Sequence, residues 1–189
     1  MKKILFFFVL VLIVSCAERK SMAAEKVAAY YKGFKKGDYK LISAVISDTL
    51  TIIEGDYTMV FTPETFYRQF KWDSVFKPVY KLVSLENRDE HIVATVSVKS
   101  LKFEFLKNNP LTCIHKFSFK SGKIVKIKNQ ECIDANWEIW QKKRDSLVAW
   151  IKLNHPELDG FVHDLSTKGA IDYLTAIELY KKQQGNRVE

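Results

Sequence analysis

The sequence lacks the short motifs that many hydrolases, kinases and dehydrogenases carry. It has only seven glycines, and no glycine-rich loop that could hold a phosphate group. No serine lies in a Gly-x-Ser-x-Gly turn, and none of the four histidines belongs to a His-Glu-x-x-His zinc motif. The sequence therefore argues against these enzyme classes, and it predicts neither a metal site nor a cofactor.

Long apolar runs are also missing, apart from one at the start of the chain. Residues 4–14 are apolar, follow Lys2 and Lys3, and lead through Ser15 to Cys16. A helix of this length spans about half of a hydrocarbon core roughly 30 Å thick, so it is too short to cross a bilayer comfortably. A basic start, a short apolar run and a small residue before the cut are typical of a secretory signal peptide.

The cysteine that ends this run makes the segment resemble a bacterial lipoprotein signal. The resemblance implies that residues 1–15 are removed and that Cys16 becomes the first residue, carrying lipid such as palmitate. We therefore expect a cell-envelope protein anchored in a membrane by Cys16, with residues 16–22 as a tether. Ala17, in place of an aspartate, favours the outer membrane. The alternative is an ordinary cleaved signal in which Cys16 has no role.

Only two cysteines remain if Cys16 carries lipid. Cys113 and Cys132 lie at the outer ends of an expected hairpin, and disulfides form in exported proteins. Closing this loop would stabilise the protein by roughly 3 kcal/mol. A simple hairpin register places the two cysteines near each other without requiring that they lie opposite, and a β-bulge could aim one at the other. A disulfide and two buried free thiols therefore stay as alternatives.

Positive charge is concentrated in one part of the chain. Without Lys2 and Lys3, the chain has 28 basic and 22 acidic residues, a net charge of +6. Residues 99–128 contain eight lysines and a single acidic residue, Glu104. This stretch is either a solvated sheet face or a patch for anionic head groups, glycans or an acidic partner. Nucleic acid is not expected as a partner of an exported lipoprotein.

The spacing of apolar residues predicts an α+β fold. Period-3.6 segments predict helices at 24–34, 39–46, 62–72, 134–153 and 170–180, with Thr62-Pro63 and Asp134 as helix starts. Alternating segments predict strands at 50–53, 57–61, 79–85, 92–100, 101–106, 111–119 and 123–129. We expect an antiparallel sheet with one face covered by helices and the other exposed to water.

The last two strands flank Ser121-Gly122, a hairpin turn signal. A short bulged turn there predicts that Phe117 lies opposite Val125 and that His115 lies opposite Ile127. These residues would form an apolar face, and the lysines of both strands would share the other face.

The order of these elements resembles the nuclear transport factor 2-like superfamily, in its SnoaL-like branch. Residues 31–39 match its opening of a helix, Gly-Asp and a second helix, and residues 117–134 match its closing strand pair. The resemblance implies a cystatin-like cone, in which a curved antiparallel sheet wraps around N-terminal helices and leaves a pocket at the open end. The cone would cover residues 23–135, and residues 136–189 would form a helical C-terminal extension outside the minimal fold.

The superfamily includes isomerases, dehydratases and non-catalytic binders, so the resemblance leaves the activity open. His115 is the candidate acid or base, with Asp56 and Asp73 as candidate carboxylates and Glu54 beside them. Each also has a purely structural explanation: His115 as a packed core residue, Glu54 and Asp56 as turn residues, and Asp73 as a helix end.

Aromatic residues crowd the middle of the chain and could line a site for an apolar ligand or simply form the core. The candidate ligand-binding residues are Tyr57, Phe61, Trp72, Tyr80 and Phe117.

Together these features favour a lipid-anchored envelope protein that binds a small apolar ligand or an envelope protein without catalysis. The alternative is an isomerase or dehydratase that uses a pocket histidine and a carboxylate. A third hypothesis gives the C-terminal helices a scaffold role, either docking a partner or capping the cone. The sequence leaves open whether the cone pairs into a homodimer.

Overall fold

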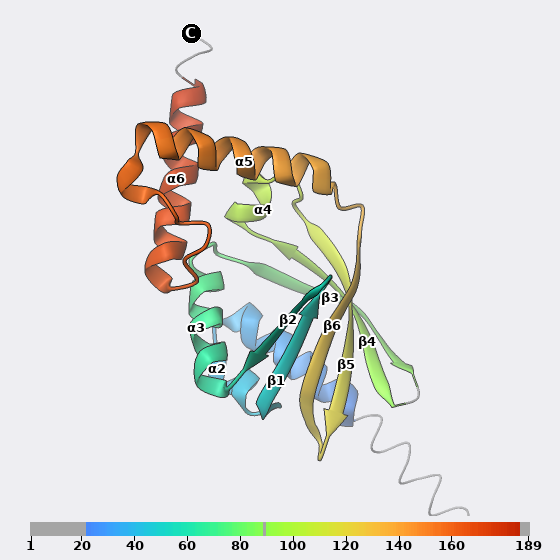
Figure 1. Cartoon of the computed structure of the whole chain (residues 1–189). Helices are drawn as coiled ribbons and strands as arrows, with labels where there is room; N and C mark the ends of the chain where they lie inside the picture. Colours follow the sequence, from blue (N-terminus) through green and yellow to red (C-terminus); the bar gives the residue numbers. More distant parts are fainter. Residues whose placement is uncertain (1–21, 89, 186–189) are drawn as a thin grey trace, which may run out of the picture.

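The computed structural model describes residues 22–88 and 90–185 (Figure 1). The expected signal peptide, the lipidated Cys16 and all of the tether except Met22 lie outside the described residues. Within the described residues, no helix is both long and apolar enough to cross a membrane.

One curved six-stranded sheet forms the wall of the fold, with the strand order β2-β1-β6-β5-β4-β3. The strands are β1 (Ile46–Glu54), β2 (Tyr57–Phe61), β3 (Val79–Arg88), β4 (His91–Lys99), β5 (Leu111–Lys120) and β6 (Lys123–Ile133). The α+β class and the curved sheet are confirmed. The prediction of purely antiparallel pairing is wrong for one pair: β1 runs parallel to β6, because the first strand joins the sheet beside the last one.

Three helices near the N-terminus cover the inner face of this sheet: residues 22–36, α2 (Tyr39–Ser43) and α3 (Pro63–Ser74). Their apolar side chains share one core with β1, β4, β5 and β6. The second helix ends earlier than predicted. Ile46 opens β1, where it pairs with Ile124, so strand pairing overrides the helical pattern at this position.

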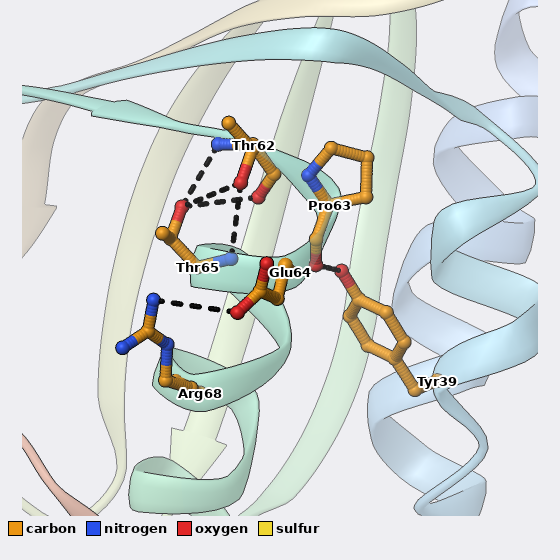
Figure 2. Close-up of polar contacts among 6 residues, drawn as sticks. All are labelled: Tyr39, Thr62, Pro63, Glu64, Thr65 and Arg68. Carbon is orange, nitrogen blue, oxygen red and sulfur yellow. Dashed lines mark hydrogen bonds and ion pairs between the residues drawn. The ribbon is translucent and has the colours of Figure 1, made fainter.

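The start of α3 is closed by its own side chains (Figure 2). The Thr62 hydroxyl accepts a hydrogen bond from the backbone N–H of Thr65 at 3.2 Å, and the Thr65 hydroxyl accepts one from the N–H of Thr62 at 2.8 Å. Pro63 occupies the first turn, as predicted, and its carbonyl accepts a hydrogen bond from the Tyr39 hydroxyl. This capping box fixes the residue at which α3 begins. Asp73 lies in the last turn of the same helix.

The register of the β5–β6 hairpin differs from the prediction. Phe117 lies opposite Ile127 and His115 opposite Asn129. The shift is two residues. One comes from the tighter turn, in which Lys120 pairs with Lys123, and the other from a β-bulge, where Val125 is the extra residue between two paired positions. The sequence pattern did not reveal this bulge.

A second bulge interrupts the pairing between Ile114 and His115. With both bulges in place, Cys113 lies directly opposite Cys132, and the two Sγ atoms form a disulfide. The two cysteines therefore lie opposite each other only because the two bulges shift the register of the strands.

The predicted strand at 101–106 is instead a short helix, α4 (Leu101–Phe105). The Ser100 hydroxyl accepts a hydrogen bond from the backbone N–H of Phe103 at 3.1 Å and so caps this helix. The alternation of Phe103 and Phe105 predicts a strand, but on this helix the two rings pack against different partners. Phe103 contacts Trp140, and Phe105 contacts Tyr180.

Helices α5 (Trp137–Asn154) and α6 (Thr167–Gly185), with a 3-10 turn (Pro156–Leu158) between them, form the C-terminal part. Asn136, not the predicted Asp134, caps α5, because its side chain accepts a hydrogen bond from the N–H of Ile139 at 2.9 Å. Both helices bury apolar side chains against the ends of α3 and α4 in a second core cluster. This burial favours capping of the cone. Four large apolar residues of these helices are nevertheless 39–83% exposed, so the helices also keep a surface on which a partner could dock: Trp137, Ile139, Leu153 and Ile171.

Candidate functional site

A pocket of about 480 Å³ lies on the inner face of the sheet, bordered by α3, α4 and the start of α5. This volume is within the range of small-molecule sites in proteins. Most of its wall is apolar or aromatic, including Phe34, Phe61, Trp72, Val98, Trp137 and Trp140. The pocket therefore suits a ligand that is mainly apolar and has flat faces.

His115 lines the pocket from β5 and is hydrogen-bonded to Tyr31 of the N-terminal helix. The Tyr31 hydroxyl oxygen and the His115 Nδ1 are 2.6 Å apart. Burial lowers the pKa of His115 to about 4 and raises the pKa of Tyr31 well above its ordinary value. Both side chains are consequently neutral near pH 7, and the pair offers a polar contact without a charge.

Asp73 lines the same pocket from the last turn of α3. The Tyr80 hydroxyl donates a hydrogen bond to its Oδ2 at 2.7 Å. Burial raises the pKa of Asp73, although the Lys102 ammonium and the hydrogen bond from Tyr80 act in the opposite direction. A carboxylate with a raised pKa beside an apolar pocket can exchange a proton with a ligand.

Lys102 extends from α4 into the pocket and is the polar group that the sequence did not reveal. Its Nζ lies 4.4 Å from the ring centre of Trp72, 5.2 Å from that of Phe76 and 5.3 Å from that of Phe103. Such ring faces attract a cation. Burial lowers the pKa of Lys102, and the carboxylates of Asp73 and Glu54 oppose this shift.

The ammonium of Lys102 makes no hydrogen bond and no ion pair with any described residue. Its N–H groups are therefore free to donate to an oxygen of a bound molecule. Glu54 also lines the pocket but is exposed at its rim. The described residues contain no group of three or more His, Cys, Asp or Glu side chains that could hold a metal ion.

The structure brings most of the predicted site residues together, but not all of them. His115, Asp73, Phe61, Trp72 and Tyr80 line the pocket, as does Glu54. Cys113 and Cys132 belong to its wall as well.

Three candidates lie elsewhere. Asp56 is exposed in the β1–β2 turn, because Gly55 adopts φ +58° there and reverses the chain. Tyr57 is 78% exposed at the start of β2. Phe117 is fully buried in the core, where it packs against the rings of Tyr30 and Tyr31, and it is not among the residues that line the pocket.

Comparison with known proteins gives structural neighbours only. No family model matches the sequence, and no curated protein matches it either. Bal32a, from a soil-derived mobile gene cassette, is 14% identical with a TM-score of 0.52, over 66% of this chain and 97% of that protein. A proposed ketosteroid isomerase from Kribbella flavida is 9% identical with a TM-score of 0.50, over 61% of this chain and 81% of that protein.

The chain shares the fold of these two solved structures, a curved sheet packed on helices. The expected resemblance is thereby confirmed at the level of the fold. Identities this low say nothing about activity. About a third of this chain lies outside the match to Bal32a.

The sequence pattern does not place Lys102 in the site because it predicts a strand at residues 101–106. In a strand, Lys102 would alternate with its apolar neighbours and point to water. The available signal was Ser100, a good helix cap immediately before the five residues Leu101–Phe105.

The buried histidine predicts a dependence of stability on pH. Between its ordinary pKa of 6.5 and its pKa of about 4 in the fold, the unfolded chain binds a proton at His115 that the folded chain does not. The stabilisation from His115 is therefore complete above about pH 6.5 and is lost as the pH falls toward about 4.

Urea unfolding of the wild type and of His115→Gln between about pH 7 and about pH 4 measures this effect. We expect the wild type to lose stability relative to the variant as the pH falls through this window. The carboxylates titrate in both proteins, so their contribution cancels in the difference. A difference between the two proteins that stays constant with pH would contradict the lowered pKa.

Proposed function

We propose that this protein binds a small, mainly aromatic or apolar molecule in its pocket, without changing it chemically. The observation that carries this proposal is the combination of aromatic walls with Lys102, whose N–H groups have no partner among the described residues. A ligand with one oxygen-bearing end would satisfy Lys102 and bury its apolar part against the rings.

The open pocket favours a small molecule over an envelope protein as the ligand. A cone filled by its own side chains would have left only the outer surface for function. Instead, the core side chains, such as Phe117, pack behind the pocket, and a cavity remains between them and the C-terminal helices.

We also propose that the protein works in the cell envelope, attached to a membrane by lipid on Cys16. The support for this location is the signal segment alone: a basic start, the apolar residues 4–14 and the cysteine after Ser15. The ligand would then be a molecule that reaches the envelope, on the periplasmic side or the cell surface.

A pair of neighbouring substitutions tests whether the pocket binds ligands. Met59 lines the pocket, whereas the adjacent Val60 is 65% exposed on the other face of the same edge strand. The probe is 1-anilinonaphthalene-8-sulfonate, which joins an aromatic body to one anionic oxygen group. We expect Met59→Trp to fill the pocket and weaken probe binding by about tenfold, and Val60→Trp to leave it unchanged.

The Lys102→Met variant tests, in the same titration, whether the Lys102 ammonium holds the anionic end of the probe. Methionine keeps most of the length and apolar contact of lysine but removes the charge, so we expect weaker probe binding with an intact fold. If Met59→Trp and Val60→Trp bind the probe equally well, the pocket is not the binding site. Equal binding by Lys102→Met and the wild type would remove Lys102 from the proposal.

A second candidate function is an isomerase or dehydratase type of enzyme. The observation in its favour is that His115 and Asp73 line one pocket, Asp73 with a raised pKa and a hydrogen bond from Tyr80. In this alternative, Asp73 would take a proton from a carbon of the ligand, and Lys102 or the His115–Tyr31 pair would hold the oxygen that gains charge.

Proton exchange distinguishes the enzyme from the binder. An enzyme of this type would speed the exchange of deuterium from D₂O into the carbons beside the carbonyl of 2-tetralone, and Asp73→Asn would abolish that gain. A pure binder would show no acceleration by the wild type over free carboxylate at the same concentration.

A further inference from the structure

The outer face of the β5–β6 hairpin carries five lysines and no other charged group near its turn. Because side chains alternate between faces, His115 and Phe117 point inward while the lysines point outward. The bulge at Val125 keeps the lysines of β6 in step with those of β5. The five residues, named here the lysine face, are Lys116, Lys120, Lys123, Lys126 and Lys128.

The strand register pairs these like charges directly. Lys116 lies opposite Lys128, and Lys120 lies opposite Lys123. Like charges at directly opposite positions destabilise a sheet, so this arrangement works against folding. The hairpin contains one acidic residue, Glu131, at its far end beside Ile114.

Within the described part of the chain, none of the five lysines has an ion-pair partner. Lys123 donates a hydrogen bond to the carbonyl of Ala44, which is neutral. The positive charge of this face is thus uncompensated within the described fold, and an anionic surface would neutralise it.

The N-terminal helix begins beside the turn of this hairpin. Lys26, on its first turns, donates a hydrogen bond to the carbonyl of Gly122 in the turn. Cys16 precedes the first described residue, Met22, by six positions, a length of chain that reaches about 20 Å at most. A lipid on Cys16 would therefore hold the hairpin turn close to the membrane surface.

We infer that the lysine face rests on an anionic phospholipid bilayer. The pocket lies on the inner face of the sheet, and Figure 1 shows α5, which borders it, at the opposite end of the molecule from the β5–β6 turn. The ligand site would consequently stay open to the aqueous side while the hairpin contacts head groups. The geometry of this inference rests on the lipid anchor proposed above, but the charge of the lysine face does not.

A bilayer suits this surface better than an acidic protein, because a lipid on Cys16 would keep the lysine face near a membrane. Attraction between exposed lysines and anionic lipids acts over about 10 Å at moderate salt. The anchor keeps the lysine face within reach of a membrane at all times, whereas a protein partner would have to find it by diffusion.

Lysine footprinting on vesicles tests the inference directly. The lipidated wild-type protein is placed on phosphatidylcholine vesicles with or without phosphatidylglycerol, acetylated briefly, and analysed by mass spectrometry. We expect the lysine face to be acetylated at least about threefold more slowly on the anionic vesicles. The exposed Lys142, Lys152 and Lys182, on α5 and α6, should react equally on both and serve as internal controls.

A matched pair of triple variants gives a second readout that does not need the lipid. The test variant is Lys116→Gln, Lys126→Gln and Lys128→Gln, and the control variant is Lys142→Gln, Lys152→Gln and Lys182→Gln. Both lose three positive charges. Without the lipid, binding to phosphatidylglycerol vesicles should weaken about fivefold for each lysine removed from the lysine face, and much less in the control.

These outcomes distinguish membrane contact by the lysine face from lipidation of Cys16. Failure of the wild type to stay on neutral vesicles would contradict lipidation of Cys16, and the triple variants would still decide the role of the lysine face. Equal acetylation on both kinds of vesicle, or equal loss of binding in both variants, would overturn the inference. Protection of these lysines in native envelopes but not on phosphatidylglycerol would also overturn it, in favour of an acidic protein or glycan.

Discussion

Replacing Phe117 by alanine is expected to lower the free energy of unfolding by about 3–5 kcal/mol. Phe117 is fully buried, and its ring centre lies 5.8 Å from that of Tyr30 and 5.9 Å from that of Tyr31. Deleting the ring would leave a cavity in the core between the sheet and the N-terminal helix. Urea unfolding monitored by circular dichroism measures the loss.

The matched control for this prediction is Tyr57→Ala. Tyr57 is also aromatic and was also a candidate ligand contact, but it is 78% exposed. Its removal should change the free energy of unfolding by less than about 0.5 kcal/mol. A Phe117→Ala variant as stable as Tyr57→Ala would mean that the core is not packed as described.

Removing the disulfide is expected to lower the free energy of unfolding by about 3 kcal/mol. Cys113 and Cys132 are 19 residues apart in sequence, and their bond limits the freedom of the unfolded chain. The variant to compare is Cys113→Ala with Cys132→Ala, since alanine leaves no polar group in the partly buried site. The measurement is urea unfolding in the absence of reducing agent.

Reducing agent supplies the control for the disulfide. In dithiothreitol, the wild type should lose most of its advantage over the double variant, because its two cysteines are then separate thiols. An advantage that persists unchanged under verified reduction would show that packing of the cysteine side chains, and not the bond, accounts for the difference. Because both cysteines belong to the pocket wall, the double variant should also weaken the binding of the sulfonate probe.

The two bulges of the β5–β6 hairpin show where reasoning from the sequence reached its limit. Alternation correctly placed His115 and Phe117 on the inner face and the lysines on the outer face. It did not place Val125 as an extra residue. The bulge puts Ile124 and Ile127, three positions apart, on the same buried side, so the strict alternation assumed for this strand fails there. The opposition of Cys113 to Cys132 depends on both bulges.

The segment from Leu101 to Phe105 shows a second limit. Five residues are too few for the period of the pattern to separate a helix from a strand. The decision came from the Ser100 cap and from the packing of Phe105 and Leu106 against the C-terminal helices. Lys102 enters the pocket as a consequence, so the most informative polar residue of the site was outside the sequence prediction.

The sequence by itself determined the α+β class, most of the helices and strands and the capped start of α3, because these depend on local periodicity and capping residues. The cone followed from the resemblance of the element order to a known superfamily. It also supplied His115 and Asp73 as candidates. Only the tertiary structure decided that these two line one pocket with Lys102, that Asp56, Tyr57 and Phe117 do not, and that the lysines of the outer face lie directly opposite one another. Those relations join residues far apart in the chain, and they follow from the curvature and register of the sheet, which no local pattern encodes.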